Sequence, residues 1–298
     1  MRIEGSVVVV TGATSGIGRA TALRLCAGGA RVVLVARGAE GLAATAAECR
    51  GLGGQTLALS ADVADAEAVE RVAATTVERF GRIDGWVNSA GVEMFGAFLD
   101  APLDEIRRVL DVDLGGCVHG CRSALSRMVP QGHGVVVNLS SILGIVAQPY
   151  GAGYTMAKFA VRGLGACLRQ ELRLAGVRGV DVCTVFPTAI DTPMWQDAAN
   201  RTGRRVRALP PPLPPERVAA AVVRRLRRPR GETVVGGLLG RALLAQYRLW
   251  PGSAEWTIGI GLERWGLSPT KRAPSTAGNL FRPAPGPGAV RGGWRADR

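Results

Sequence analysis

The chain has 298 residues, and its 47% hydrophobic content suits one large α/β domain with a tail or two small domains. The formal net charge of +13 belongs to the C-terminal third, because residues 1–200 hold 18 basic and 19 acidic side chains. No recognisable nucleic-acid-binding motif accompanies the basic third, which argues against a DNA-binding protein. The six cysteines lack Cys-x-x-Cys spacing and the histidines number only 2, so we expect free thiols and no metal site.

Short apolar runs alternate with helix-compatible patterns along most of the chain. The apolar runs predict strands at residues 7–11, 31–36, 55–60, 83–88, 135–140, 180–186 and 233–237. Helices are predicted at residues 16–28, 39–51, 65–80, 102–129, 153–175 and 216–228. Because continuous apolar strands are covered on both faces, the pattern predicts an α/β fold, a doubly wound parallel sheet (Rossmann fold) with helices on both faces.

We expect a catalytic domain over residues 1–237, which includes a substrate loop at 187–215. An apolar extension with three tryptophans follows at 238–268, and the Pro-, Gly- and Arg-rich residues 269–298 are predicted to form a disordered tail. No targeting segment is expected before the first strand, so we predict a cytoplasmic protein.

The apolar extension leaves two interpretations open. Its apolar run at residues 238–249, with tryptophans and arginines nearby, would suit a weak peripheral contact with anionic lipid. Alternatively, the segment covers the mouth of the active site or packs on the core. We favour the second interpretation because the apolar face is short and broken by glycines.

The first predicted strand leads into a glycine-rich turn, Thr11-Gly12-Ala13-Thr14-Ser15-Gly16-Ile17-Gly18, and a helix follows at once. Glycines allow a tight turn, and the start of a helix offers unpaired N–H groups to a pyrophosphate. The second strand ends at Ala36, where NAD-binding proteins carry an acidic residue, and Arg37 follows. Because an arginine can neutralise a 2′-phosphate, we expect NADP(H) as the cofactor rather than NAD.

A tyrosine and a lysine stand out on the predicted helix at 153–175. Lys158 is one of two lysines among 37 basic residues, which suggests that it remains where arginine cannot replace it. It follows Tyr154 by four positions, so both side chains share one helix face. A compact ammonium tunes a phenol and fits between ribose hydroxyls in a way that a planar guanidinium does not. Such a pair alone would also suit an ordinary helix surface.

Five motifs in order resemble the short-chain dehydrogenase/reductase family, in its short single-domain branch, over roughly residues 5–237. These motifs are the glycine turn, Asp62-Val63, Asn88-Ser89-Ala90-Gly91, Ser141 thirteen residues before Tyr154, and Tyr154-x-x-x-Lys158. The resemblance implies an NADP(H)-dependent oxidoreductase that interconverts a ketone or aldehyde and an alcohol, on a largely apolar small-molecule substrate. We also expect a homo-oligomer.

The resemblance implies a role for each catalytic residue. Tyr154 would act as general acid or base towards the substrate oxygen, and Ser141 would hydrogen-bond that oxygen. Lys158 would lower the pKa of the phenol and bind the nicotinamide ribose. The candidate catalytic residues are Ser141, Tyr154, Lys158 and Asp113. The candidate cofactor contacts, from the glycine turn and the resemblance together, are Gly12, Thr14, Ser15, Gly16, Ile17, Gly18, Arg37, Asp62, Val63, Asn88, Ala90, Gly91, Tyr154, Lys158, Pro187, Ile190 and Thr192.

Two residues depart from the family pattern. Asp113 stands where the family has an asparagine that supports a water between the lysine and solvent. An aspartate can hold that water, but it adds a negative charge near Lys158. Thr188 follows Pro187 where the family has a glycine. A catalytically weakened NADP-binding regulatory or scaffold protein is therefore the alternative, which the intact serine, tyrosine and lysine disfavour.

Substrate contacts are expected at the strand ends and in the loop after the sixth strand, at residues 93–98, 143–150 and 192–202. Four large side chains in these segments favour a sizeable apolar substrate: Met94, Phe95, Met194 and Trp195. Steroid-like, fatty acyl, polyketide and terpenoid carbonyls all fit this description.

Overall fold

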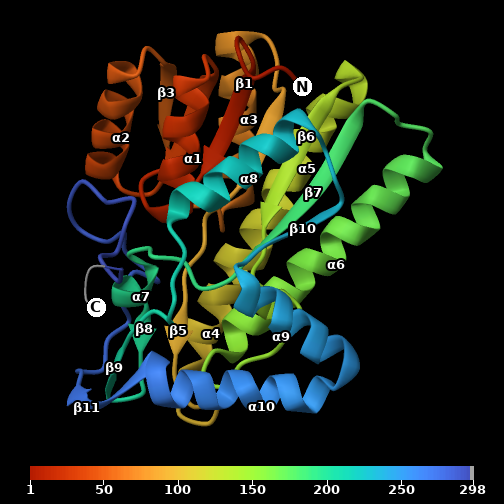
Figure 1. Ribbon diagram of the computed structural model, residues 1–298. Helices are drawn as coiled ribbons and strands as arrows, with labels where there is room; N and C mark the ends of the chain where they lie inside the picture. The colour runs from red at the N-terminus through yellow and green to blue at the C-terminus, as the bar shows by residue number, and fades with distance from the viewer. Residues whose placement is uncertain (296–298) are drawn as a thin grey trace.

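The structure is a computed structural model that describes residues 1–295, and its centre is a sheet of seven parallel strands (Figure 1). The strands lie in the order β10-β7-β6-β4-β1-β2-β3. Their bounds are β1 (Val7–Thr11), β2 (Arg31–Ala36), β3 (Gln55–Ser60), β4 (Gly85–Asn88), β6 (Gly134–Leu139), β7 (Val180–Pro187) and β10 (Glu232–Val235). The predicted doubly wound sheet is confirmed. Its order reverses between β1 and β4, and ligands of such sheets bind beside the strand ends at this point.

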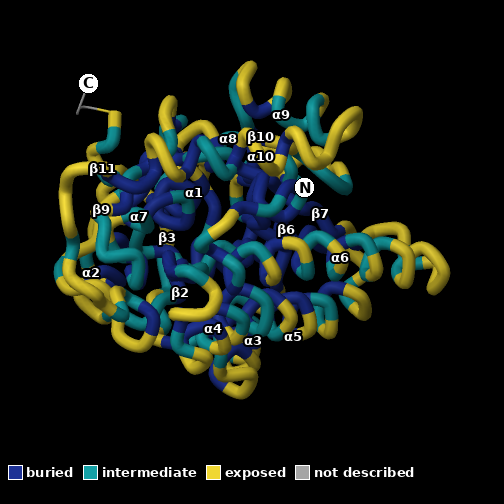
Figure 2. The backbone as a smooth tube through the Cα atoms, turned by 90° about the horizontal axis from the view of Figure 1, so that it is seen from below, coloured by how far each residue is buried: buried dark blue, intermediate teal, exposed yellow. Residues whose placement is uncertain are grey.

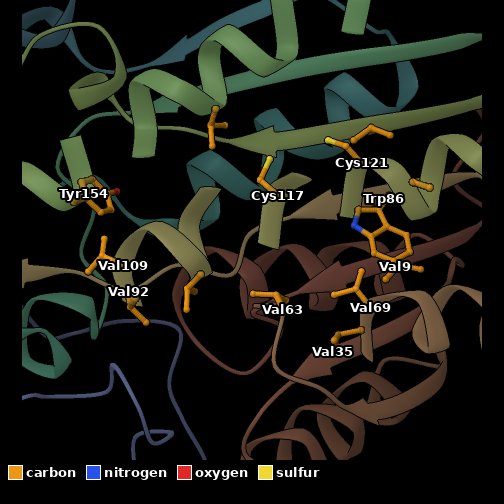
Figure 3. Close-up of a cluster of buried hydrophobic side chains, with 14 of the residues drawn as sticks. Val9, Val35, Val63, Val69, Trp86, Val92, Val109, Cys117, Cys121 and Tyr154 are labelled. Atoms are coloured by element: carbon orange, nitrogen blue, oxygen red, sulfur yellow. The ribbon is translucent and has the colours of Figure 1, made fainter. Parts of the chain in front are cut away.

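Alternate residues of β1 supply two separate hydrophobic clusters, because successive side chains of a strand point to opposite faces. Val8 and Val10 belong to the cluster with residues of α1 (Gly16–Ala27), α2 (Ala39–Gly51) and α8 (Pro215–Arg227). Val9 belongs to the cluster with residues of α3 (Ala66–Phe80), α5 (Gly116–Gln131) and α6 (Ala152–Leu174), part of which is drawn in Figure 3. Helices therefore cover both faces of the sheet.

The single helix expected over residues 102–129 is divided by a π-helical turn. α4 (Leu103–Leu110) runs into this turn, η1 (Asp111–Gly115), and α5 continues from it. A π-helical turn holds one residue more than an α-helical turn and often lies at a functional site. Apolar periodicity does not resolve one extra residue, so the sequence pattern missed the interruption.

Two segments that follow β7, residues 188–213 and 236–272, lie beyond the carboxyl ends of the strands, in the lower part of Figure 1, while α8 and β10 between them return to the sheet. The expected loop at 187–215 contains α7 (Met194–Asp197), β8 (Ala199–Asn200) and β9 (Arg204–Val206). β8 pairs with β5 (Met94–Phe95), and β9 pairs with β11 (Leu267–Arg272). The apolar extension folds into α9 (Leu238–Leu249), α10 (Pro251–Gly261) and the π-helical turn η3 (Leu262–Gly266).

The outer side of the apolar extension is exposed, as the yellow segments of α9 and α10 in Figure 2 show. Trp250 and Trp256 are 65% and 69% exposed, and Leu238 is 83% exposed. Within residues 1–295 no helix is long and apolar enough to cross a membrane.

The tail expected to be disordered over residues 269–298 instead follows the molecular surface through residue 295. It begins in β11, and the Leu280 side chain is completely buried. Composition predicted disorder because prolines and glycines rarely form ladders or cores. Here main-chain carbonyls of the tail accept hydrogen bonds from arginines of the fold, so the segment needs little regular structure. Residues 296–298 of the predicted tail lie outside the described residues.

Candidate active site

A cavity of about 930 Å³ lies at the carboxyl ends of the strands, where the sheet order reverses. It brings together nearly all the predicted site residues, which come from distant parts of the chain. The predicted residues that line it are Gly12, Thr14, Ser15, Gly16, Ile17, Gly18, Arg37, Asp62, Val63, Ala90, Gly91, Ser141, Tyr154, Lys158, Pro187, Ile190 and Thr192.

Asn88 and Asp113 are the predicted site residues that do not line the cavity. The Asn88 side chain lies in the core, where its amide nitrogen donates to Asn138 Oδ1 at 2.8 Å. Its oxygen accepts a hydrogen bond from Trp86 Nε1, also at 2.8 Å. Asn88 therefore connects β4 with β6 below the cavity floor.

The glycine turn has the close approaches that its sequence predicts. A Cβ at Gly12 would lie 2.8 Å from the Ala90 backbone, and one at Gly18 would lie 2.1 Å from the Gly12 oxygen. The N–H groups of Ile17 and Gly18, in the first turn of α1, have no hydrogen-bond partner among the described residues. Two free amides at a helix start fit the pyrophosphate of a dinucleotide.

Arg37 comes directly after β2, and the end of β2 lies beside the glycine turn. Its Nη1 donates to the Leu280 carbonyl at 2.8 Å, and its Nη2 donates to the Asn279 carbonyl at 2.6 Å. Burial lowers the pKa of Arg37, while Asp62 opposes that change. Asp62 in turn forms an ion pair with Arg108 of α4. Arg108 could not be predicted as a site residue, because an arginine inside an amphipathic helix matches no motif.

Ser141, Tyr154 and Lys158 meet on the opposite side of the cavity. Tyr154 and Lys158 project from α6, and the ammonium lies 5.0 Å from the centroid of the phenol ring. Ser141 follows β6 and begins the short 3₁₀ helix η2 (Ile142–Gly144), where its Oγ accepts the Leu143 N–H at 3.1 Å. That bond uses the Ser141 oxygen as an acceptor and leaves its O–H as a donor, and a hydrogen bond from Ser141 lowers the pKa of Tyr154. In Figure 3 the Tyr154 ring lies at one end of the hydrophobic cluster, beside Val109.

Asp113 forms a direct ion pair with Lys158, in the place where a water-holding residue is expected. Its Oδ2 lies 2.8 Å from Lys158 Nζ, and its Oδ1 accepts the Val92 N–H at 2.8 Å. Both side chains are almost fully buried. Burial lowers the pKa of Lys158, but Asp113, Tyr154 and Cys117 together outweigh burial and raise that pKa above its usual range. Lys158 therefore stays charged.

The pKa of Tyr154 lies above its usual range, although Lys158 was expected to lower it. Burial is the main cause of the rise, and the nearby ammonium lowers the pKa by less than burial raises it. The Glu93 and Asp113 carboxyls raise the pKa further. At neutral pH the phenol therefore keeps its proton, which suits a proton donor better than a proton acceptor.

Glu93 is a cavity residue that the sequence analysis covered only as part of a substrate segment. Its carboxyl is buried, and its Oε1 accepts a hydrogen bond from Gln148 Nε2 at 3.3 Å. Burial raises the pKa of Glu93 to about 8, Asp113 raises it as well, and Lys158 lowers it. The sequence gives no signal of this buried position, because Glu93 is a single glutamate before two apolar residues and belongs to no motif.

The four large side chains expected near the substrate divide into two pairs. Met194 and Trp195 line the cavity. Met94 and Phe95 do not; both are buried in the core, and the Phe95 ring stacks on Trp195 with centroids 6.0 Å apart. They support the wall of the cavity from behind. No cluster of three metal-ligating side chains occurs in the part of the chain that the structure describes.

Known proteins resemble this chain in sequence. A family model described as short chain dehydrogenase matches residues 6–203. The putative oxidoreductase SadH of Mycobacterium tuberculosis is 39% identical over 200 residues, which cover 67% of this chain and 72% of SadH. The D-threitol dehydrogenase of Mycolicibacterium smegmatis is 37% identical over 228 residues, which cover 74% of this chain and 86% of that protein.

Solved structures of similar fold contain bound dinucleotides. A short chain dehydrogenase/reductase from Burkholderia phymatum, in complex with NAD, matches with a TM-score of 0.77 and 26% identity, over 91% of this chain and 99% of that one. An alcohol dehydrogenase from Thermococcus sibiricus, complexed with 5-hydroxy-NADP, matches with a TM-score of 0.68 and 28% identity, over 78% of this chain and 96% of that one.

The ion pair predicts a measurable effect on the phenol. Asp113→Asn removes a negative charge that raises the pKa of Tyr154, so that pKa should fall by about one unit, the scale of one nearby charge. The phenolate would then form at lower pH than in the unchanged chain. An ultraviolet difference titration measures this, and Tyr154→Phe identifies the transition that belongs to Tyr154. An unchanged transition would show that Asp113 does not control the phenol.

Proposed function

The chain belongs to the short chain dehydrogenase family, and we propose that it interconverts a ketone or aldehyde and an alcohol with NADP(H), on a largely apolar substrate. One observation carries the proposal: a serine, a tyrosine and a lysine line the same cavity as the glycine turn. A homo-oligomer and a cytoplasmic location stay predictions.

Each side chain of this group has a distinct chemical task in the proposed reaction. A bound nicotinamide dinucleotide would supply or accept the hydride. Tyr154 would give its proton to the substrate oxygen during reduction and take one back during oxidation. The O–H of Ser141 would donate a hydrogen bond to the same oxygen and hold it in place. Lys158, held by Asp113, would keep a positive charge beside the phenol.

The Tyr154 proton tests the proposed reaction. Tyr154→Phe should reduce turnover by ~10²-fold or more, the range of general acid catalysis, because no other group replaces that proton. NADP(H) affinity should barely change. The measurement is the change of NADPH absorbance with a panel of ketones and alcohols. Near-normal turnover of the phenylalanine variant would remove Tyr154 from the mechanism, and binding without any turnover would favour the regulatory or scaffold alternative.

The NADP(H) preference is supported by Arg37 and by the lack of an acidic side chain at the end of β2. The guanidinium has five N–H donors, and the two tail carbonyls engage one on each terminal nitrogen, so donors remain for a 2′-phosphate. The related structures contain both kinds of dinucleotide, NAD and an NADP derivative. In the proposed function, Arg37 is the side chain that favours NADP(H) over NAD.

Arg37→Ala should weaken NADPH binding by ~1–3 kcal/mol, the scale of a lost charge-assisted hydrogen bond, and leave NADH binding nearly unchanged. Isothermal titration calorimetry with both dinucleotides measures the difference. Equal losses for the two would mean that Arg37 acts by holding the tail carbonyls and does not recognise the phosphate.

The cavity wall supports an apolar substrate with a hydrogen-bonding substituent. Apolar side chains dominate its substrate end: Leu143, Met194, Trp195, Leu239, Leu243 and Ile258. Glu93 and Gln148 are the polar pair beside them, and both line the cavity. A buried carboxyl and amide favour a hydroxyl or carbonyl group close to the reacting carbon.

The leucines of α9 support the expectation that the apolar extension covers the mouth of the active site. We therefore expect no co-sedimentation of the purified protein with anionic vesicles at low salt. Sedimentation that is lost in the variant Trp250→Ala/Trp256→Ala, which changes two exposed side chains outside the cavity, would instead support the peripheral lipid contact.

A further inference from the structure

The C-terminal strap, defined as residues 279–294, runs along the outer side of the proposed cofactor cavity. It starts at the end of β2, passes the glycine turn, and ends beside the loop that follows β7. The first, middle and last parts of a dinucleotide would be expected along this same path, from adenosine through pyrophosphate to nicotinamide. In Figure 1 it is the dark blue chain beside α2 and α7.

The first part of the strap is anchored by arginines and by one buried side chain. Arg37 holds the carbonyls of residues 279 and 280, as described above. Arg108 Nε donates to the Leu280 carbonyl as well, at 2.9 Å. The Leu280 side chain is completely buried and belongs to the cluster that contains Val63 and Tyr154.

The middle of the strap lies directly on the glycine turn. The Ala289 carbonyl accepts the Gly16 N–H at 2.9 Å, and the Pro287 carbonyl accepts Arg19 Nη1 at 2.6 Å. Gly288 lies between them with φ +70, and a Cβ on it would be 2.2 Å from the Thr14 oxygen. Only a glycine therefore allows the strap to approach the turn so closely.

The last part of the strap is bound to the loop that carries Thr192. Asp191 Oδ1 accepts the main-chain N–H groups of Gly292 and Trp294, at 3.2 and 2.8 Å. The indole Nε1 of Trp294 donates to the Thr192 carbonyl at 3.1 Å. Both ends of the proposed cofactor path are thus tied to the same sixteen-residue segment.

The cavity stays open beneath the strap. Its inner wall includes Asp62, Val63 and Ala90, three of the expected cofactor contacts, and its outer wall includes strap residues between 279 and 291. Leu280 does not line it, so its buried side chain does not fill the adenosine end. Among the described residues, the N–H groups of Ile17 and Gly18 donate no hydrogen bond to the strap. The strap therefore covers the site and leaves the Ile17 and Gly18 amides free, while its carbonyls engage the predicted cofactor contacts Gly16 and Arg37.

We propose that the C-terminal strap forms the outer wall of the dinucleotide site and must detach from the glycine turn whenever cofactor enters or leaves. The proposal rests on the proposed function only in requiring that a dinucleotide is bound. Apart from the buried Leu280 side chain, most strap contacts are partly buried hydrogen bonds to its main-chain groups, which open more readily than core contacts do. Three prolines at 283, 285 and 287 restrict the detached segment, so less chain entropy is lost when it closes again.

Gly288→Ala is the sharpest test, because its Cβ would collide with the Thr14 oxygen and push the strap away. Gly176→Ala is the matched control: Gly176 has φ +69, nothing lies within 4 Å of its Cβ position, and it follows the end of α6, away from the cavity. Both variants impose the same backbone strain, and only the first displaces the strap. Gly292→Ala gives a second displacement without a positive φ, since its Cβ would lie 2.4 Å from the Thr192 oxygen.

Stopped-flow fluorescence of NADPH gives the association and dissociation rates, and neither requires turnover of a substrate. In Gly288→Ala and Gly292→Ala both rates should rise, dissociation by ~10-fold or more, because most effects of lost contacts appear in dissociation. Gly176→Ala should keep both rates of the unchanged chain. Hydrogen exchange of peptides from residues 279–294 should slow when NADPH binds to the unchanged chain, and it should be fast in the two strap variants.

Two results would overturn the proposal. In the strap variants, faster hydrogen exchange of the strap peptides with unchanged rates of NADPH association and dissociation would show that the strap does not form a wall of the site. Tighter NADPH binding in the strap variants, with dissociation unchanged, would show that the segment competes for the site. None of these measurements requires turnover of a substrate. If the chain binds NADPH but reduces no ketone, the proposed reaction is contradicted, and the measurements still decide whether the strap is the wall of the site.

Discussion

Lys158 and Asp113 form a buried ion pair at the point where α6 crosses the π-helical turn η1, and the geometry of the active site depends on this pair. Two charges removed from water are stable only when they are paired and hydrogen-bonded. Asp113 meets that condition through Lys158 and the Val92 N–H, and Lys158 also donates to the Leu139 carbonyl at 3.3 Å. The pair thus joins α6 and η1 to the loop after β4 and to the end of β6, and it positions Tyr154 one helical turn before the lysine.

The same pair explains why the phenol and the lysine differ from the simple expectation. An isolated ammonium beside a phenol would lower the pKa of the phenol. Here the ammonium is neutralised by a carboxylate, the phenol is buried, and Glu93 adds a second carboxyl nearby. These groups come from three separate segments of the chain. Their net effect on the pKa of Tyr154 depends on burial and on the distances between the groups, and neither can be read from a sequence motif.

Much of the fold follows from the sequence because its signals are local. Most of the seven strands are short apolar runs, and the glycine turn lies between a strand and a helix, so both could be predicted. Most of the predicted contacts line the cavity because their motifs follow strand ends, which meet at one edge of a parallel sheet. Asn88 was misplaced because its motif does not say which way the amide points. The turn η1 was missed because one added residue barely alters apolar periodicity.

The strap shows where composition gives the wrong expectation. Prolines, glycines and arginines predicted disorder, yet this segment is held by hydrogen bonds of its main chain and by one buried leucine. Because the strap follows every strand of the central sheet in the chain and domains fold from the N-terminal side, the sheet and the glycine turn can form before residue 279 is synthesised. The cavity is therefore open on its outer side until the strap has been made.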